Sequence, residues 1–360
     1  MKIIHCADIH ADSRMGTHFS KDAADRRRNE IAESFERMVD YAGKNDVRAI
    51  IIAGDLFDTK ETLHKQIKKR IGHVICQNPQ IDFLYLRGNH DEDLSFLSEE
   101  KPANLKTFKK GQWTSYSYDD IKIYGQELSD SLPLSVYTGL NPEADCVNIV
   151  VMHGQVAEYK AKDGAPVISL PKLANKNIDY LALGHIHDYK IEKLDKRGVW
   201  SYSGCLEGRG FDECGKKGFV LLDIKDKKIK ADFIPDCSRT VSEIQVELSG
   251  SMSYSQIMSA VEAALQSLSA DDIVQVDLTG EISEDTDIEI SSYEKALQGR
   301  FFYIRFKDRT EAIIDYKKYE KDLSLKGEFI RLVKADEKLT DEEKSKIIMT
   351  GIKALAGRLN

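Results

Sequence analysis

Residues 49–58 read AIIIAGDLFD, and this stretch decides the expected fold. The run from Ala49 to Ala53 is apolar and rich in isoleucine, which is typical of a strand buried on both faces. Gly54 ends the run, and the carboxylates of Asp55 and Asp58 follow it. Because Gly and Asp also favour turns, this segment by itself predicts either a polar turn or the rim of a functional site.

Four more segments repeat this pattern of an apolar run followed by His, Asp or Asn. The runs comprise residues 3–4, 83–86, 147–152 and 180–183, which resemble buried strands. The polar clusters after them are Asp8-Ile9-His10, Gly88-Asn89-His90-Asp91, His153-Gly154 and Gly184-His185-Ile186-His187. Each cluster taken singly also fits a turn, a strand-end polar pair or a histidine satisfied in the core. Their recurrence in this order favours one shared site.

Helical patterns between the strand-like runs predict a layered α/β domain. Ile31, Phe35, Met38 and Ala42 recur at helical spacing between the first two runs. In such a domain, groups just past the carboxyl ends of neighbouring strands face one crevice. Carboxylate, amide and imidazole donors gathered there can hold two divalent ions that promote phosphoryl transfer. The five clusters supply all three kinds of donor.

Bulk composition excludes several classes of protein. The chain has 360 residues, which is too long for a single hydrophobic core. Two domains, or one domain with appendages, are therefore expected. Hydrophobic residues make up 41% and charged residues 31%, as in a globular protein. No apolar run approaches the roughly 20 residues of a membrane helix. The N-terminus lacks a signal-peptide pattern and the six cysteines show no CxxC spacing, so we expect a cytoplasmic protein without membrane attachment.

The net charge of −8 is concentrated in the last third of the chain. Residues 241–360 hold 16 Lys+Arg and 23 Asp+Glu, whereas residues 1–240 are nearly neutral, with a net charge of −1. A nearly neutral catalytic part can bind phosphates once two divalent cations are added. Basic clusters at 26–28, 65–70 and 109–110 are candidate phosphate contacts or, alternatively, solvated faces.

The pattern of elements changes after residue 240. Residues 241–315 alternate strand-like and helical stretches and predict a small α+β cap. Residues 316–360 look helical, and Thr340 to Glu343 match a capping box. The last helix carries an apolar stripe that either packs on its own domain or docks a partner. The stripe comprises Ile348, Ile352, Leu355 and Leu359.

As an ordered set, the five clusters resemble the calcineurin-like metallophosphoesterase superfamily, with the motifs DxH, GDxxD, GNHD, HG and GHxH over residues 8–187. The finer pattern resembles the SbcD family of DNA-repair nucleases. It rests on Phe57-Asp58 within the GDLFDT segment, on the glycine-rich loop 204–218, and on the cap followed by helices. Ala11-Asp12 departs from many members, in which Leu-Gly often follows the first histidine, and this leaves the substrate preference open.

The resemblance implies a four-layer α/β/β/α sandwich over residues 1–240, a cap over 241–315 and partner-docking helices over 316–360. It also implies how the ligands divide. Asp8, His10, Asp55 and His187 would hold one ion; Asp55, Asn89, His153 and His185 would hold the second, with Asp55 bridging. His90 would face the scissile phosphate as a catalytic group. Asp58 and Asp91 would orient ligands or, alternatively, stabilise a turn and a helix start, and Arg209 is a candidate contact to DNA phosphate.

The expected function is a phosphodiesterase with two divalent ions, Mn²⁺ in preference to Fe²⁺ or Zn²⁺. It is expected to cut DNA as an exonuclease and, as a secondary expectation, as an endonuclease. The expected partners are DNA, a coiled-coil ATPase of the SbcC type and a second copy of the chain. One alternative is a phosphatase or a phosphodiesterase acting on small molecules or cyclic nucleotides. Another is a non-catalytic scaffold that binds DNA ends.

Overall fold

The chain divides into two units in the computed structural model, Met1–Val241 and Ser242–Asn360. The structure describes residues 1–355 except 14, 16–18, 20, 59–64, 89–90, 92–100, 129–132, 157–164, 284–285, 287, 314–315 and 320. None of the described helices is both long and apolar enough to cross a membrane.

Two six-stranded sheets form the centre of the first unit. In chain order, the first sheet contains β1 (Lys2–Cys6), β2 (Val47–Ala53), β3 (Asp82–Leu86), β4 (Leu105–Thr107), β13 (Gly218–Lys225) and β14 (Lys228–Pro235), arranged as β14-β13-β1-β2-β3-β4. The second contains β5 (Thr114–Tyr118), β6 (Ile121–Gly125), β7 (Val147–His153), β10 (Tyr180–Gly184), β11 (Lys190–Lys193) and β12 (Val199–Tyr202), arranged as β11-β12-β10-β7-β6-β5. Strands β1 to β4 pair in parallel, as do β6, β7, β10 and β12. Their carboxyl ends therefore share one edge within each sheet.

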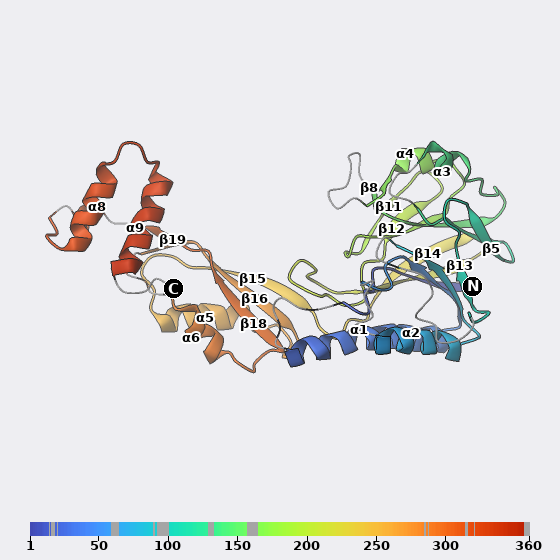
Figure 1. The fold of residues 1–360 in the computed structure, drawn as a ribbon, viewed down its shortest axis with the longest axis horizontal. Helices are drawn as coiled ribbons and strands as arrows, with labels where there is room; N and C mark the ends of the chain where they lie inside the picture. Colours follow the sequence, from blue (N-terminus) through green and yellow to red (C-terminus); the bar gives the residue numbers. More distant parts are fainter. Residues whose placement is uncertain are drawn as a thin grey trace. The chain divides into compact units, whose positions relative to one another are not determined.

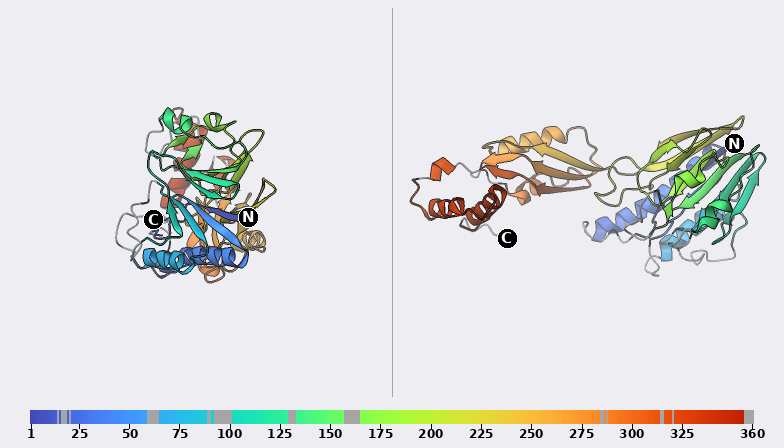
Figure 2. Two further views of the ribbon diagram at one scale, coloured as in Figure 1. Left: turned by 90° about the vertical axis from the view of Figure 1, so that its right-hand side faces the viewer. Right: turned by 90° about the horizontal axis from the view of Figure 1, so that it is seen from above.

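Helices cover the outer faces of both sheets. On the first sheet lie α1 (Lys21–Lys44) and α2 (Lys65–Gln77); on the second lie the short α3 (Leu134–Thr138) and α4 (Leu170–Leu173). Figure 1 shows α1 and α2 together along one side of this unit and α3 with α4 on the opposite side. Figure 2 gives the same layers end-on, with the two sheets stacked between the helices. The predicted α/β/β/α sandwich is confirmed.

The isoleucine run of strand β2 is buried throughout because both faces of the strand are covered. Side chains alternate between the two faces of a strand. Ile50 and Ile52 pack in the core under α1 and α2, and Ile51 packs between the sheets, all with 0% exposure. The helix predicted between the first two strands likewise turns Phe35 and Met38 into the outer core.

The second unit combines a small sheet with terminal helices. The sheet has the order β15-β16-β18, from β15 (Val241–Glu247), β16 (Ile273–Thr279) and β18 (Tyr303–Asp308). Helices α5 (Tyr254–Ala264) and α6 (Ile290–Ala296) share its apolar core, and β17 (Glu281–Ser283) pairs with β19 (Glu311–Ile313). The chain ends in α7 (Tyr316–Tyr319), α8 (Leu325–Ala335) and α9 (Asp341–Leu355).

The predicted capping box begins α9. The Thr340 backbone N–H donates to Glu343 over 2.8 Å, and the Glu343 N–H donates to the Thr340 hydroxyl over 3.3 Å. The two contacts satisfy amides that an isolated helix start leaves without acceptors.

Candidate metal centre

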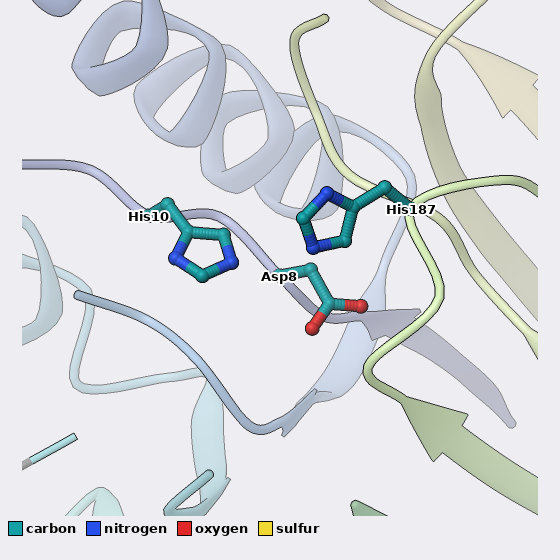
Figure 3. A group of neighbouring side chains, drawn as sticks. All are labelled: Asp8, His10 and His187. Atoms are coloured by element: carbon teal, nitrogen blue, oxygen red, sulfur yellow. The ribbon is translucent and has the colours of Figure 1, made fainter. Parts of the chain in front are cut away.

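Five of the predicted ligands gather at the carboxyl ends of four parallel strands. Asp8 and His10 follow β1, Asp55 follows β2, His153 ends β7, and His187 follows β10. Their side chains form two groups in which one ligand atom per residue lies within 4.8 Å of the others: Asp8, His10 and His187, and Asp8, Asp55 and His153. Figure 3 shows Asp8, His10 and His187 pointing toward one another.

Asp55 lies between histidines of the two groups. Its Oδ2 atom is 3.3 Å from Nε2 of His153 and 3.9 Å from Nε2 of His10. Asp8 belongs to both groups. His185 stands beside His153, with ring centroids 5.6 Å apart. Asn89 and His90 lie outside the described residues.

Three histidines use Nδ1 for a supporting contact. The pairs and their nitrogen-to-oxygen distances are His153 with the Ala53 carbonyl at 2.9 Å, His187 with Glu213 at 2.6 Å and His10 with Asp58 at 3.2 Å. Carbonyl and carboxylate oxygens accept hydrogen bonds, so Nδ1 is the donating nitrogen in His153 and His187, whose contacts are hydrogen bonds. Nε2 is thereby left as the atom that can bind a metal.

Three glycines of the sequence clusters make room for these ligands. A Cβ at Gly54 would lie 2.1 Å from Nδ1 of His153, and one at Gly88 would lie 2.1 Å from Oδ1 of Asp55. A Cβ at Gly184 would lie 2.8 Å from Nδ1 of His153. These distances are too short for a carbon, so a larger residue would displace His153 or Asp55 or, at Gly184, clash first with the Ala53 carbonyl at 2.0 Å.

The backbone at the centre is held in a costly conformation. Asp8, His10, Asp55 and His185 have positive φ angles of 50°, 46°, 51° and 109°. A non-glycine residue in such a region costs about 1–3 kcal/mol, and such strain concentrates at functional sites. Hydrogen bonds hold the loops in place: the amides of Asp8 and His10 donate to the carbonyls of Gly54 and Asp55, each over 3.0 Å.

The electrostatics of the centre favour cations. Asp8 and Asp55 are 0% and 2% exposed, and their carboxylates approach one buried point. Burial alone lowers the pKa of His153, but the neighbouring Asp55 and Asp8 carboxylates outweigh it and raise this pKa to about 9. Hard oxygen donors combined with imidazole nitrogens fit a transition-metal ion. The residues present therefore fit a two-metal centre.

Asp91 and Asp58 brace the loops around the ligands. Asp91 accepts the backbone N–H groups of Gly88 and Phe57, each over 2.9 Å, and so ties the loop after β3 to the loop after β2. Burial and the nearby Asp55 charge raise the pKa of Asp91. The contact with His10 lowers the pKa of Asp58 to about 2, so this carboxylate stays ionised.

Glu213 is a candidate site residue that the sequence did not predict. It lies in the glycine-rich loop 204–218, 4% exposed, and contacts both His187 and Arg209. A lone acidic residue in a loop carries no signal of its own. Arg209, predicted as a DNA contact, is ion-paired with Glu213 over 2.8 Å; its contact with DNA stays a prediction.

A family model for calcineurin-like phosphoesterases matches residues 1–189, more than half of the chain. The chain belongs to this family. Metallophosphoesterases are hydrolases with a two-metal centre, so the chain is a hydrolase and its clustered ligands are candidates for that centre. The resemblance drawn from the five sequence clusters is confirmed at this level.

Curated relatives include both an uncharacterized protein and DNA-repair proteins. The uncharacterized metallophosphoesterase YhaO of Bacillus subtilis is 24% identical over 248 residues, covering 65% of this chain and 60% of the relative. The DNA double-strand break repair protein Mre11 of Methanosarcina acetivorans is 25% identical over 317 residues, covering 82% and 48%. Mre11 of Saccharolobus solfataricus is 28% identical over 253 residues, covering 64% and 62%. The chain thus spans less than two thirds of the length of each of these three relatives.

Proposed function

We propose that this metallophosphoesterase hydrolyses phosphodiester bonds in DNA, as an exonuclease with a secondary endonuclease activity. The convergence of five predicted ligands, with the Nε2 atoms of His10 and His153 near Asp55, carries the phosphodiesterase part. The similarity to Mre11 proteins supports DNA as the substrate.

Mn²⁺ is the proposed metal, with Fe²⁺ or Zn²⁺ as substitutes. Asp8, His10 and His187 would hold the first ion, and Asn89, His153 and His185 the second, with Asp55 shared. When bound, two such ions supply an activated water and charge stabilisation for a phosphoryl transition state. The protein's part is to hold each Nε2 in place through the Nδ1 contacts.

His90 is the proposed catalytic side chain. It follows the proposed ligand Asn89 in the sequence and has no ligand role assigned to it. An imidazole at the scissile phosphate could donate a proton to the leaving oxygen, a contribution worth about 10²–10⁴ in rate.

The second unit is proposed to bind a coiled-coil ATPase of the SbcC type through its terminal helices. Four apolar side chains on or beside these helices are exposed: Leu323 at 96%, Leu325 at 72%, Leu332 at 64% and Ile347 at 38%. The stripe predicted from the sequence is only partly available, because Ile348 is buried against Tyr319 and Ile330. Leu355 and Leu359 lie outside the described side chains.

A phosphoesterase acting on small molecules is the second candidate. The net charge of −7 over residues 241–360 favours it, because an acidic segment repels a polyanion. On this alternative the terminal helices would serve a different partner.

Hydrolysis assays separate the two functions. The protein with Mn²⁺ should cut linear duplex DNA as well as bis(p-nitrophenyl) phosphate. Cleavage of the small diester without any cutting of DNA would contradict the nuclease proposal. His90→Asn should lower turnover on DNA by roughly 10²–10⁴ while metal content stays unchanged, and it should affect the small diester less because nitrophenolate leaves without a proton. The matched control is His73→Asn, an exposed histidine of α2, which should keep full activity.

A further inference from the structure

The loop 204–218 closes around His187. The Cys205 amide donates to the His187 carbonyl over 3.3 Å, and the Lys217 ammonium donates to the same carbonyl over 3.0 Å. Both ends of the loop are therefore hydrogen-bonded to the backbone of His187, the proposed ligand beyond the end of β10.

Glu213 lies at the centre of this loop and meets the ring of His187. Its Oε1 atom is 2.6 Å from Nδ1, a short hydrogen bond to an ionised acceptor. The other oxygen accepts the backbone N–H of Arg209 over 2.8 Å. The carboxylate is thus held from two directions and has little freedom to turn away from the histidine.

Arg209 joins Glu213 to Asp58. Its Nη2 atom lies 2.8 Å from Oε1 of Glu213, and its Nη1 atom lies 3.8 Å from Oδ1 of Asp58. The same Asp58 oxygen is 3.2 Å from Nδ1 of His10. Arg209 Nη2 also approaches Nδ1 of His187 at 3.2 Å, but that nitrogen is the donor to Glu213. A continuous path of polar contacts through Glu213, Arg209 and Asp58 therefore connects Nδ1 of His187 to Nδ1 of His10. It runs on the side of each ring away from Nε2.

The loop itself is anchored in the outer helix layer. Glu207, 2% exposed, pairs with the buried guanidinium of Arg27 on α1 over 3.0 Å and accepts the Ser238 amide over 2.6 Å. Arg27 also donates to the Gly208 carbonyl over 2.9 Å. Breaking a buried pair of this kind is costly, so the loop has a firm base beside Arg209.

We propose that Glu213 and Arg209 form a positioning clamp that sets the tautomer of His187 and holds it at a fixed separation from His10. The proposal rests on the two-metal centre proposed above. A carboxylate accepting from Nδ1 leaves Nε2 free for metal, and such supporting partners change metal affinity by about 10–100-fold. Arginine suits the role because its planar fork can serve two carboxylates at once, which a lysine cannot do equally well.

The clamp and the DNA-contact interpretation of Arg209 predict different results. If Arg209 contacts DNA phosphate, removing its side chain should weaken DNA binding at low salt and leave the affinity for Mn²⁺ intact. A clamp residue would change the affinity for Mn²⁺ and the hydrolysis of the small diester as well. Arg209→Lys retains the positive charge and removes the fork, so it separates these roles.

Two measurements on Glu213→Gln test the clamp. Mn²⁺ titration should show one of the two sites weakened by about 10–100-fold and the other nearly unchanged. Histidine ¹⁵N spectra of the metal-free protein, at a pH where the ring is neutral, should show His187 protonated at Nδ1 in the wild type. In the variant they should show a mixture of tautomers. The matched control is Asp212→Asn, an exposed carboxylate next to Glu213, which should behave as wild type in both measurements.

The two measurements keep the proposals distinguishable. A wild-type protein that binds no Mn²⁺ would overturn the two-metal function, while the tautomer spectra would still decide the clamp. Wild-type His187 protonated at Nε2, or unchanged Mn²⁺ affinity in both Glu213→Gln and Arg209→Lys, would overturn the clamp. If Glu213→Gln fails to fold, Arg209→Lys provides the Mn²⁺ reading, and the wild-type spectrum alone decides the tautomer.

Discussion

The two units differ in which side chains they bury: the first buries most of the buried polar side chains, and the second exposes most of the exposed apolar ones. Among the described residues, all but three of the buried polar or charged side chains belong to the first unit; the exceptions are Asp272, Gln275 and Asp277. All but one of the exposed large apolar side chains belong to the second unit, and the exception is Leu134.

This contrast indicates different tasks. Burying polar groups costs free energy unless they are paired, and the buried ones in the first unit include the clustered candidate ligands Asp8, His10, Asp55 and His153. Exposed apolar side chains mark interaction sites when they form a patch, and Leu325 and Leu332 lie about two turns apart on α8. The first unit has the features of an enzyme, and the exposed leucines of the second unit fit the docking role proposed for it.

The largest expected effect belongs to the first unit. Asp55→Asn removes the charge between His10 and His153, so both metal positions should weaken. Bound Mn²⁺, measured by elemental analysis after desalting, should fall clearly below wild type, and diester hydrolysis should fall by at least about 10²-fold. Asp40→Asn, an exposed aspartate of α1, is the control. Unchanged Mn²⁺ content in Asp55→Asn would remove the basis of the contrast.

The second prediction concerns stability within the second unit. Ile348 is 0% exposed between the terminal helices, so Ile348→Ala should lower the free energy of unfolding of this unit by about 2–5 kcal/mol. Leu325→Ala, at 72% exposure, should change it by less than about 0.5 kcal/mol. Urea unfolding followed by circular dichroism measures both. Equal losses would mean that the exposed leucine is part of the core.

The third prediction tests docking directly. Leu325→Glu combined with Leu332→Glu should weaken binding to the ATPase by about 30-fold, the effect of losing an interface hot spot, without lowering the melting temperature. Leu134→Glu is the matched control, because this leucine is equally accessible at 62% but lies in the first unit. Binding is measured by calorimetry with the purified ATPase. Equal weakening by the control would show that exposure alone, and not the helical module, decides binding.

The smallest expected effect is proton release on metal binding. The metal-free pKa of His153 is raised from 6.5 to about 9, so its protonated form contributes stability below pH 6.5 that is lost as pH rises through about 9. Between these values Mn²⁺ must displace that proton. Calorimetry in buffers of different ionisation enthalpy should show about one proton fewer released by His153→Asn than by wild type. His73→Asn should release as many protons as wild type.

Local spacing in the sequence determined the elements and the chemistry. The isoleucine run at 49–53 predicts a strand buried on both faces because side-chain direction alternates with every residue. The polar clusters after each run could be placed at one edge because parallel strands bring their carboxyl ends together. The capping box at Thr340 was equally readable, since its two partners are three residues apart.

Only the tertiary structure decided how distant segments support the site. Glu213 lies 26 positions beyond His187, and Arg27 pairs with Glu207 across 180 positions, so no local pattern announces either contact. The same holds for Ile348: helical spacing identified an apolar stripe but could not tell a self-packed face from an exposed one. Periodicity records which side chains share a face, whereas what covers that face depends on the path of the chain through space.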